Sequence, residues 1–224
     1  ASSAASDVYK RQKLVRQRNA ALKQFLKKGR QDLVLLDTLD EQMVELGSLI
    51  YSHRKEFINN FLPVFLENHS ALVGNKEAVN IDYDSQLNEV RMDVGLKQSR
   101  QKDLITARSN YGPHKDDLKF LMENQPIKNI GSQGQQKSFL VALKLAQYTL
   151  IKKNTNQDPF LFLDDLFDKF DESRVQLLIK LIKSNEIGQV FLTDTHPERI
   201  KNLLEQNNIE HLLIQVDNAV LSYG

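Results

Sequence analysis

A four-residue apolar run that ends in two adjacent acids constrains the fold of this chain more than any other feature. The run, residues 160–163, reads Phe-Leu-Phe-Leu and lies between two segments with helical periodicity, residues 135–152 and 172–184. A second apolar run follows at residues 190–193. Helices that alternate with short apolar strands form parallel sheets covered by helices, in which the strands are buried on both faces. The sequence therefore predicts an α/β fold.

The acidic pair follows the first of these strands directly. Asp164 and Asp165 would lie at its carboxyl end, where open α/β sheets bind their ligands. Two adjacent carboxylates at that place could hold magnesium through water and orient an attacking water molecule. A strand that simply ends in a polar turn produces the same string, so both interpretations remain open.

The helix that precedes this strand begins with a second candidate site, GSQGQQK at residues 131–137. Ser132 can cap the helix, and Gly134 lets the backbone come close to a ligand. The first amides of the helix and its positive dipole end favour an anion, with Lys137 one turn further on. An ordinary serine-capped helix after a glycine turn would look the same.

Two more polar positions follow the acidic pair. Asp171 comes six residues later and would start the next helix, and the strand at residues 189–193 delivers His196 to the same edge of the sheet. A histidine at such a position can hydrogen-bond a terminal phosphate, whereas a surface turn before a proline is the alternative.

The sequence lacks the loop that would complete a nucleotide site. None of its nine glycines belongs to a G-x-x-x-x-G-K-[ST] sequence, whose amides cradle the phosphates of a nucleotide. We therefore expect the C-terminal portion of an ATPase. We also expect that this portion by itself does not hydrolyse ATP.

The first third of the chain is predicted to form an antiparallel helical arm. Apolar residues recur at spacings of three, four and seven from Leu39 to Phe61, and Gly29 is a plausible stop for a preceding helix. Pro63 should end or kink the second helix. The tract of small residues and its continuation up to residue 12 resemble a non-native tail. We assign residues 1–12 to this tail, 13–70 to the arm and 71–224 to the ATPase part.

The segment between the arm and the signature helix has a mixed pattern. Val79 and Ile81 alternate as in a strand, and residues 87–109 favour a helix. The apolar runs at residues 118–122 and 127–130, which are separated by Asn-Gln-Pro, predict a hairpin.

Basic residues cluster at the start of the arm. Residues 10–30 contain nine Lys or Arg and no Asp or Glu, although the net charge of the whole chain is only +1. Binding to DNA phosphates requires such clustering, and the scarcity of aromatic residues there favours backbone contact over base recognition. A solvated helix face is the alternative. The candidate DNA-binding residues are Arg16, Arg18, Lys23, Lys27, Lys28 and Arg30.

Composition excludes several other classes of site. The absence of cysteine excludes disulfides, thiolate metal sites and a cysteine nucleophile, and the five histidines show no paired metal-ligand spacing. No apolar run approaches the ~20 residues that span a bilayer. We expect a soluble, cytoplasmic protein without a membrane partner.

Four motifs together are similar to one known family. They are RQRNA at residues 16–20, GPHKDDL at 112–118, GSQGQQK at 131–137 and LDDLFD at 163–168. This combination resembles the RecF family of bacterial recombination mediators from about Lys13 to the C-terminus. The resemblance implies the C-terminal half of an ABC-type ATPase head, a parallel sheet covered by helices, with an inserted helical arm lobe.

The resemblance also implies a role for each candidate residue in binding ATP and Mg2+. The signature would contact the γ-phosphate of ATP held by the opposite subunit, and its members here are Ser132, Gly134, Gln135 and Lys137. Asp164 would serve magnesium, and Asp165 would take the water-orienting role that most ABC ATPases give to glutamate. Asp171 matches the D-loop aspartate, although Lys-Phe replaces the usual Glu-Leu before it, and His196 fits the switch histidine.

The function implied by this resemblance is that of a slow, ATP-controlled DNA clamp. Such a protein forms an ATP-dependent homodimer at gapped DNA or a junction of single and double strands, and it helps load recombinase together with RecR and RecO. It would serve DNA replication, repair and the SOS response at the nucleoid. Two alternatives remain open: another ABC-type head, such as an SMC-like or transporter subunit, or a non-enzymatic helical interaction module.

Overall fold

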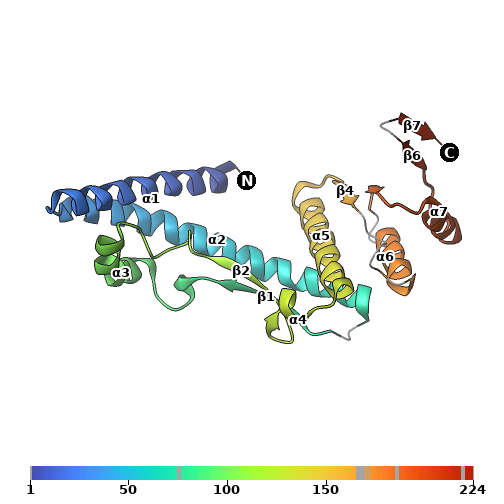
Figure 1. Cartoon of the computed structure of the whole chain (residues 1–224), viewed down its shortest axis with the longest axis horizontal. Coiled ribbons are helices and arrows are strands. Elements are labelled where there is room, and N and C mark those ends of the chain that lie inside the picture. The colour runs from blue at the N-terminus through green and yellow to red at the C-terminus, as the bar shows by residue number, and fades with distance from the viewer. Residues whose placement is uncertain are drawn as a thin grey trace. The chain divides into compact units, whose positions relative to one another are not determined.

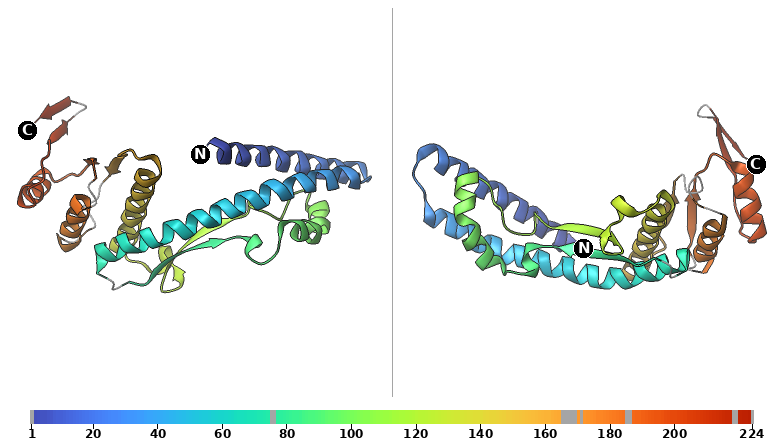
Figure 2. Two further views of the ribbon diagram at one scale, coloured as in Figure 1. Left: turned by 180° about the vertical axis from the view of Figure 1, so that it is seen from behind. Right: turned by 60° about the horizontal axis from the view of Figure 1, so that its bottom comes forward.

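The computed structural model of the chain describes residues 2–74, 77–164, 170, 172–184, 187–217 and 220–223. The chain divides into two compact units. The first unit comprises Ala1–Asn60 and Ile81–Lys119, and the second comprises Phe61–Asn80 and Phe120–Gly224. Figure 1 and Figure 2 show the elements of each unit from three directions.

The first unit is built on two long helices joined by a short turn. Helix α1 (Ser2–Lys28) ends at Gly29, whose φ of 65° is the left-handed conformation that glycine adopts readily. Helix α2 (Leu33–Val73) begins where the Asp32 carboxylate accepts a hydrogen bond from the amide of Leu35, at 3.0 Å. The stop predicted at Gly29 is confirmed. Helix α1 also includes most of the segment 1–12, for which a non-native tail was predicted.

Of the two effects predicted for Pro63, an end or a kink of the second helix, the end does not occur, because α2 continues ten residues further, to Val73. Proline removes one backbone hydrogen bond, and packing of the following turns has to offset that loss. In the second unit, the fully buried ring of Phe65 lies 4.6 Å from the ring of Phe139. Aromatic pairs of this kind contribute beyond the apolar area that they bury.

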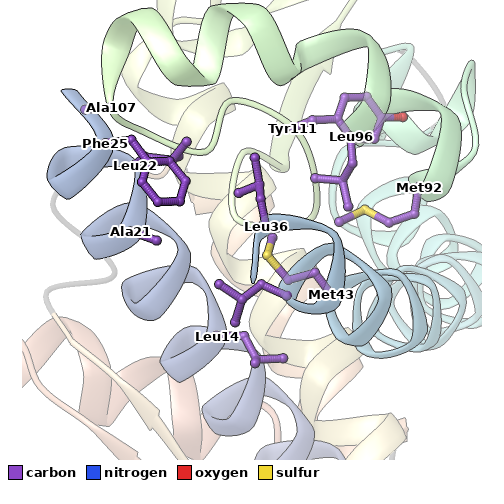
Figure 3. Close-up of a cluster of buried hydrophobic side chains, with 11 residues drawn as sticks. Leu14, Ala21, Leu22, Phe25, Leu36, Met43, Met92, Leu96, Ala107 and Tyr111 are labelled. Atoms are coloured by element: carbon purple, nitrogen blue, oxygen red, sulfur yellow. The ribbon is translucent and has the colours of Figure 1, made fainter. Parts of the chain in front are cut away.

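The core of the first unit joins three helices. Helix α3 (Met92–Thr106) follows the short 3-10 turn η1 (Gln86–Asn88) and packs against α1 and α2. Figure 3 shows the contributing side chains pointing toward one another from all three helices. The fully or nearly fully buried ones are Leu22, Leu36, Met43, Met92 and Leu96.

Two buried glycines in this core should respond differently to replacement by alanine. A Cβ on Gly95 of α3 would lie 2.1 Å from Cζ of the Tyr111 ring, so Gly95→Ala should destabilise the chain by about 1–3 kcal/mol through overpacking. A Cβ on Gly47 of α2 would meet only the flexible end of Met92, at 3.0 Å. Gly47→Ala should therefore be neutral or stabilising by up to ~1 kcal/mol, since alanine favours helix. Urea denaturation compares the two variants, and equal midpoints would contradict the clash.

A small three-stranded sheet follows α2. Its strands are β1 (Val79–Asp84), β2 (Asp117–Met122) and β3 (Gln125–Pro126), in the order β1-β2-β3. The predicted hairpin is only half right: β2 pairs with β3 for two residues, and then Ile127–Ile130 form the short helix α4. Pro126 has no amide hydrogen to extend the ladder, and the amide of Gly131 instead closes a helical turn on the carbonyl of Ile127 at 2.8 Å.

The second unit contains the alternating elements that the sequence predicts. Helix α5 (Gln133–Thr155), strand β4 (Phe160–Leu163), helix α6 (Glu172–Ser184) and strand β5 (Gln189–Leu192) follow one another, and β4 and β5 pair in parallel from Phe160↔Gln189 to Leu163↔Leu192. The predicted α/β class with a parallel sheet is thus confirmed. Helix α7 (Pro197–Gln206) and the antiparallel pair β6 (Ile214–Asp217) and β7 (Val220–Tyr223) were not predicted.

Strand β4 is buried on one face only. Leu161 and Leu163 belong to the core, whereas Phe160 and Phe162 are 62% and 59% exposed. The ring of Phe162 stacks on that of Phe191 from β5, with centroids 4.9 Å apart. The expectation of burial on both faces is therefore wrong for the two strands that the structure pairs here.

Candidate functional site

The carboxyl ends of β4 and β5 meet, as a parallel pair requires. The amide of Thr193 donates to the carbonyl of Leu163 at 3.1 Å, which continues the ladder one residue past β5. The Thr193 hydroxyl then donates to the carboxylate of Asp164, which is exposed at this edge. Asp165 lies outside the described residues. The structure thus places one of the two predicted acids at the expected edge.

The turn after β5 is organised by Asp194. Its side chain is only 1% exposed, and its Oδ1 accepts a hydrogen bond from the backbone amide of His196 at 2.6 Å. Its Oδ2 is buried and has no hydrogen-bond partner among the described residues. The imidazole of His196 stays exposed and contacts the hydroxyl of Thr195 at 3.0 Å. Thr193 and Asp194 were not among the predicted site residues, although both directly follow a strand at the predicted ligand edge.

The start of α5 has a complete capping box. The Ser132 hydroxyl accepts from the amide of Gln135 at 3.3 Å, and the Gln135 side chain accepts from the amide of Ser132 at 2.8 Å. The first intrahelical bond runs from Gln136 to the carbonyl of Ser132. The amides of Gln133 and Gly134 precede that bond, so they can donate to an external anion.

Polar contacts also fix this helix start from within. The hydroxyl of the fully buried Ser138 donates to the carbonyl of Gly134 at 2.9 Å. The Gln136 side chain donates to the carbonyl of Gly131 at 2.8 Å. Lys137 lies on the same turn and is half-buried. The predicted signature residues are therefore held on one ordered turn.

The donor set at the sheet edge suits magnesium only together with phosphate. Within the part of the chain that the structure describes, no three His, Cys, Asp or Glu side chains gather to hold a metal ion. Magnesium is commonly bound by one or two carboxylates, with waters and substrate phosphates completing the octahedron. Asp164 fits that role. Asp171, the predicted D-loop residue, lies outside the described residues.

The basic stretch, residues 10–30, is mostly exposed, but Arg11 and Arg18 are buried. Arg18 is 0% exposed. Its guanidinium donates hydrogen bonds to the carboxylate of Asp40 at 2.5 Å, to the carboxylate of Asp103 at 2.7 Å and to the hydroxyl of Ser109 at 3.0 Å. Its guanidinium is fully engaged inside the first unit, so the prediction that it contacts DNA is wrong. The other five predicted DNA-binding residues are exposed: Arg16, Lys23, Lys27 and Lys28 in α1, and Arg30 just after it.

The GPHKDDL segment, one of the four motifs that carry the family resemblance, makes side-chain contacts with several elements of the first unit. The Asp116 carboxylate accepts from the Tyr83 hydroxyl and from Arg54 at 3.2 Å, while Arg54 also donates to the carbonyl of Pro113 at 2.8 Å. Burial, followed by the hydrogen bond to Asp116, raises the pKa of Tyr83 to about 12. Arg11 contacts His114 at 2.7 Å, so the segment ties α1, α2 and β1 together.

Comparison with known proteins identifies close relatives. No protein-family model matches the chain. It is 43% identical over 197 residues to the DNA replication and repair protein RecF of Flavobacterium johnsoniae, a match that covers 88% of this chain and 55% of that protein. It is 41% identical over 205 residues to the RecF protein of Cytophaga hutchinsonii, covering 92% and 54%. The chain thus spans about half the length of these curated relatives.

Solved structures give the same fold. The recombination mediator protein RecF of the RecFOR pathway, with ATP, superposes with a TM-score of 0.78 at 20% identity and covers all of this chain and 59% of that one. A second structure, of RecF-ATPrS, gives a TM-score of 0.77 at 21% identity with the same coverage. In the described residues, no helix has the length and apolar character needed to cross a membrane. Over most of its length, the chain belongs to the RecF family.

Proposed function

We propose that this chain supplies the signature side of an ATP-controlled DNA clamp. The observation that carries the proposal is the capped start of α5, where Ser132 is exposed and the amides of Gln133 and Gly134 precede the first intrahelical bond. A second subunit could present a triphosphate to this turn, because a helix N-terminus favours an anion. The kinship with RecF proteins supports the same role.

In this proposal each part of the second unit has one task. Gln133, Gly134 and Lys137 bind the γ-phosphate of ATP held by the partner subunit, and ATP joins the two subunits when bound. Asp164 holds Mg2+ with phosphate and water, and Asp194 orients the turn that presents His196. Asp165 as the water-orienting residue and Asp171 of the D-loop complete the proposed set.

The proposed partners follow from the relatives. The solved neighbours belong to the RecFOR pathway, which supports RecO and RecR as partners and recombinase loading at gapped DNA as the task. The exposed basic residues of α1 would bind the DNA backbone. We place this activity in DNA replication and damage repair, including the SOS response, in the cytoplasm at the nucleoid.

Purified alone, the chain should not hydrolyse ATP, because its sequence contains no phosphate-binding loop. Phosphate release with ATP and Mg2+ should stay at the level of a protein-free blank. Magnesium-dependent turnover that disappears in Asp165→Asn would contradict this expectation.

The signature role has its own test, which uses the RecF protein of Flavobacterium johnsoniae as the nucleotide-bearing partner. Mass photometry should detect a mixed complex with ATP and none without nucleotide. Ser132→Arg should weaken that complex about tenfold or more, since a bulky cation would disrupt the cap and block the turn. Association that is independent of ATP, or unaffected by Ser132→Arg, argues against the proposed role.

A further inference from the structure

We infer that Arg174, in the first turn of α6, is a positioning residue that holds the signature turn of α5 in place through Ser138. The functional meaning of this inference rests on the proposed role of that turn in binding a partner's ATP. Its structural content stands on contacts within the second unit.

The first contact reaches the signature through one serine. Arg174 Nη1 donates to the hydroxyl oxygen of Ser138 at 3.2 Å, and that hydroxyl donates its own proton to the carbonyl of Gly134 at 2.9 Å. Ser138 is fully buried, so water does not compete for its hydroxyl. A cation that polarises the hydroxyl strengthens its bond to Gly134, the residue whose amide faces the proposed phosphate.

The second contact reaches the segment before β1. Arg174 Nη2 donates to Glu77 Oε1 at 3.3 Å, and both side chains are largely shielded from solvent. The planar guanidinium can bond two partners in different directions at once, which a lysine ammonium on a flexible stem does less well. Arg174 therefore joins the start of α6 to the start of α5 and to Glu77.

The end of α2 completes this cluster. His69 is buried against Phe139, the neighbour of Ser138, with ring centroids 6.1 Å apart. Its Nε2 lies 3.7 Å from Glu77 Oε2, and neither atom has a hydrogen-bond partner among the described residues. Burial is the main effect on His69 and lowers its pKa. The charge of Glu77 raises that pKa and the charge of Arg174 lowers it, so the net shift is downward and the imidazole is neutral near pH 7. The positive charge beside Glu77 therefore comes from Arg174.

This arrangement has a direct consequence for the proposed clamp. Helix α5 begins at the signature, and α6 begins next to Asp171, the residue matched to the D-loop. Both helix starts would meet the same nucleotide of the partner subunit. A residue that fixes the start of α6 against the start of α5 keeps both helix starts in the positions that the nucleotide requires. Displacing groups at such a site by about 1 Å can lower activity by about 100-fold.

Hydrogen exchange of the complete 224-residue chain tests the positioning directly. In Arg174→Gln, the amides of residues 136–139 should exchange about tenfold faster, while those of β4 and β5 keep their rates. Ser138→Ala removes the relay without changing charge and should have the same local effect. Lys180→Gln, an equal loss of charge at an exposed site of α6, is the matched control and should change nothing.

Association with the Flavobacterium RecF protein provides the functional measurement. Arg174→Gln and Ser138→Ala should each weaken the ATP-dependent complex about tenfold, Arg174→Lys should recover part of the loss, and Lys180→Gln should bind like the unmodified chain. If the unmodified chain forms no ATP-dependent complex, the proposed function fails while the exchange data still decide the role of Arg174. Unchanged local exchange, or a uniform rise across the second unit in both variants, overturns the inference.

Discussion

Replacement of Arg18 by methionine should lower the free energy of unfolding by about 3–5 kcal/mol, the range measured when one partner of a buried ion pair is removed. The guanidinium is 0% exposed and bonds Asp40 and Asp103 together. Methionine fills much of the same volume but leaves the carboxylate of Asp103, itself 0% exposed, without its cation. Urea denaturation followed by circular dichroism at 222 nm measures the loss.

Arg16 provides the matched control, since it lies two residues away on the same helix and is exposed. Arg16→Met should change stability by no more than ~0.5 kcal/mol, as is usual for surface substitutions. If Arg18→Met were as mild as Arg16→Met, the buried network would not hold the three helices together. The comparison separates the loss of a particular contact from the loss of a positive charge.

Charge reversal of the exposed arm residues should have the second large effect, this time on DNA binding. Changing Lys23, Lys27, Lys28 and Arg30 to glutamate removes up to four phosphate contacts, each of which contributes about 0.9 to the slope of log affinity against log salt. We expect affinity for a gapped duplex to fall about 100-fold or more at 50 mM salt. The slope should become shallower by about 3–4. Fluorescence anisotropy across a salt series measures both quantities.

An equal change of charge elsewhere is the control for that experiment. Four exposed lysines of the second unit, Lys144, Lys153, Lys180 and Lys201, can be changed to glutamate. Their reversal should cost much less affinity than reversal of the arm set. A similar loss from both sets would mean that net charge, and not the basic surface of α1, governs binding.

The sequence predicts best those elements whose signals are local. Strand β4 and helix α6 have the predicted bounds, because an apolar run and a helical period need only neighbouring residues to be recognised. The capping box of Ser132 belongs to the same class, since both of its bonds span three residues. Asp164 lies at the expected edge because parallel strands end together.

Contacts between distant residues could not be predicted in this way. Arg18 meets Asp103 across 85 positions, so a run of basic residues looked like a solvated or DNA-binding face although one member is the centre of a buried network. Asp116 collects Tyr83 and Arg54 across 33 and 62 positions. Arg174, which reaches Glu77 across 97 positions, gave no signal at all beyond its helical segment.

The stacked phenylalanines of β4 and β5 have a consequence for oligomers of this chain. Phe160, Phe162 and Phe191 form an exposed apolar strip on a sheet of two described strands, and such strips promote self-association as concentration rises. Dimers formed through this strip would need no nucleotide, because burial of apolar surface alone would drive them. Dependence on ATP, more than the presence of a dimer, is therefore the property that distinguishes a clamp from adhesion between hydrophobic surfaces.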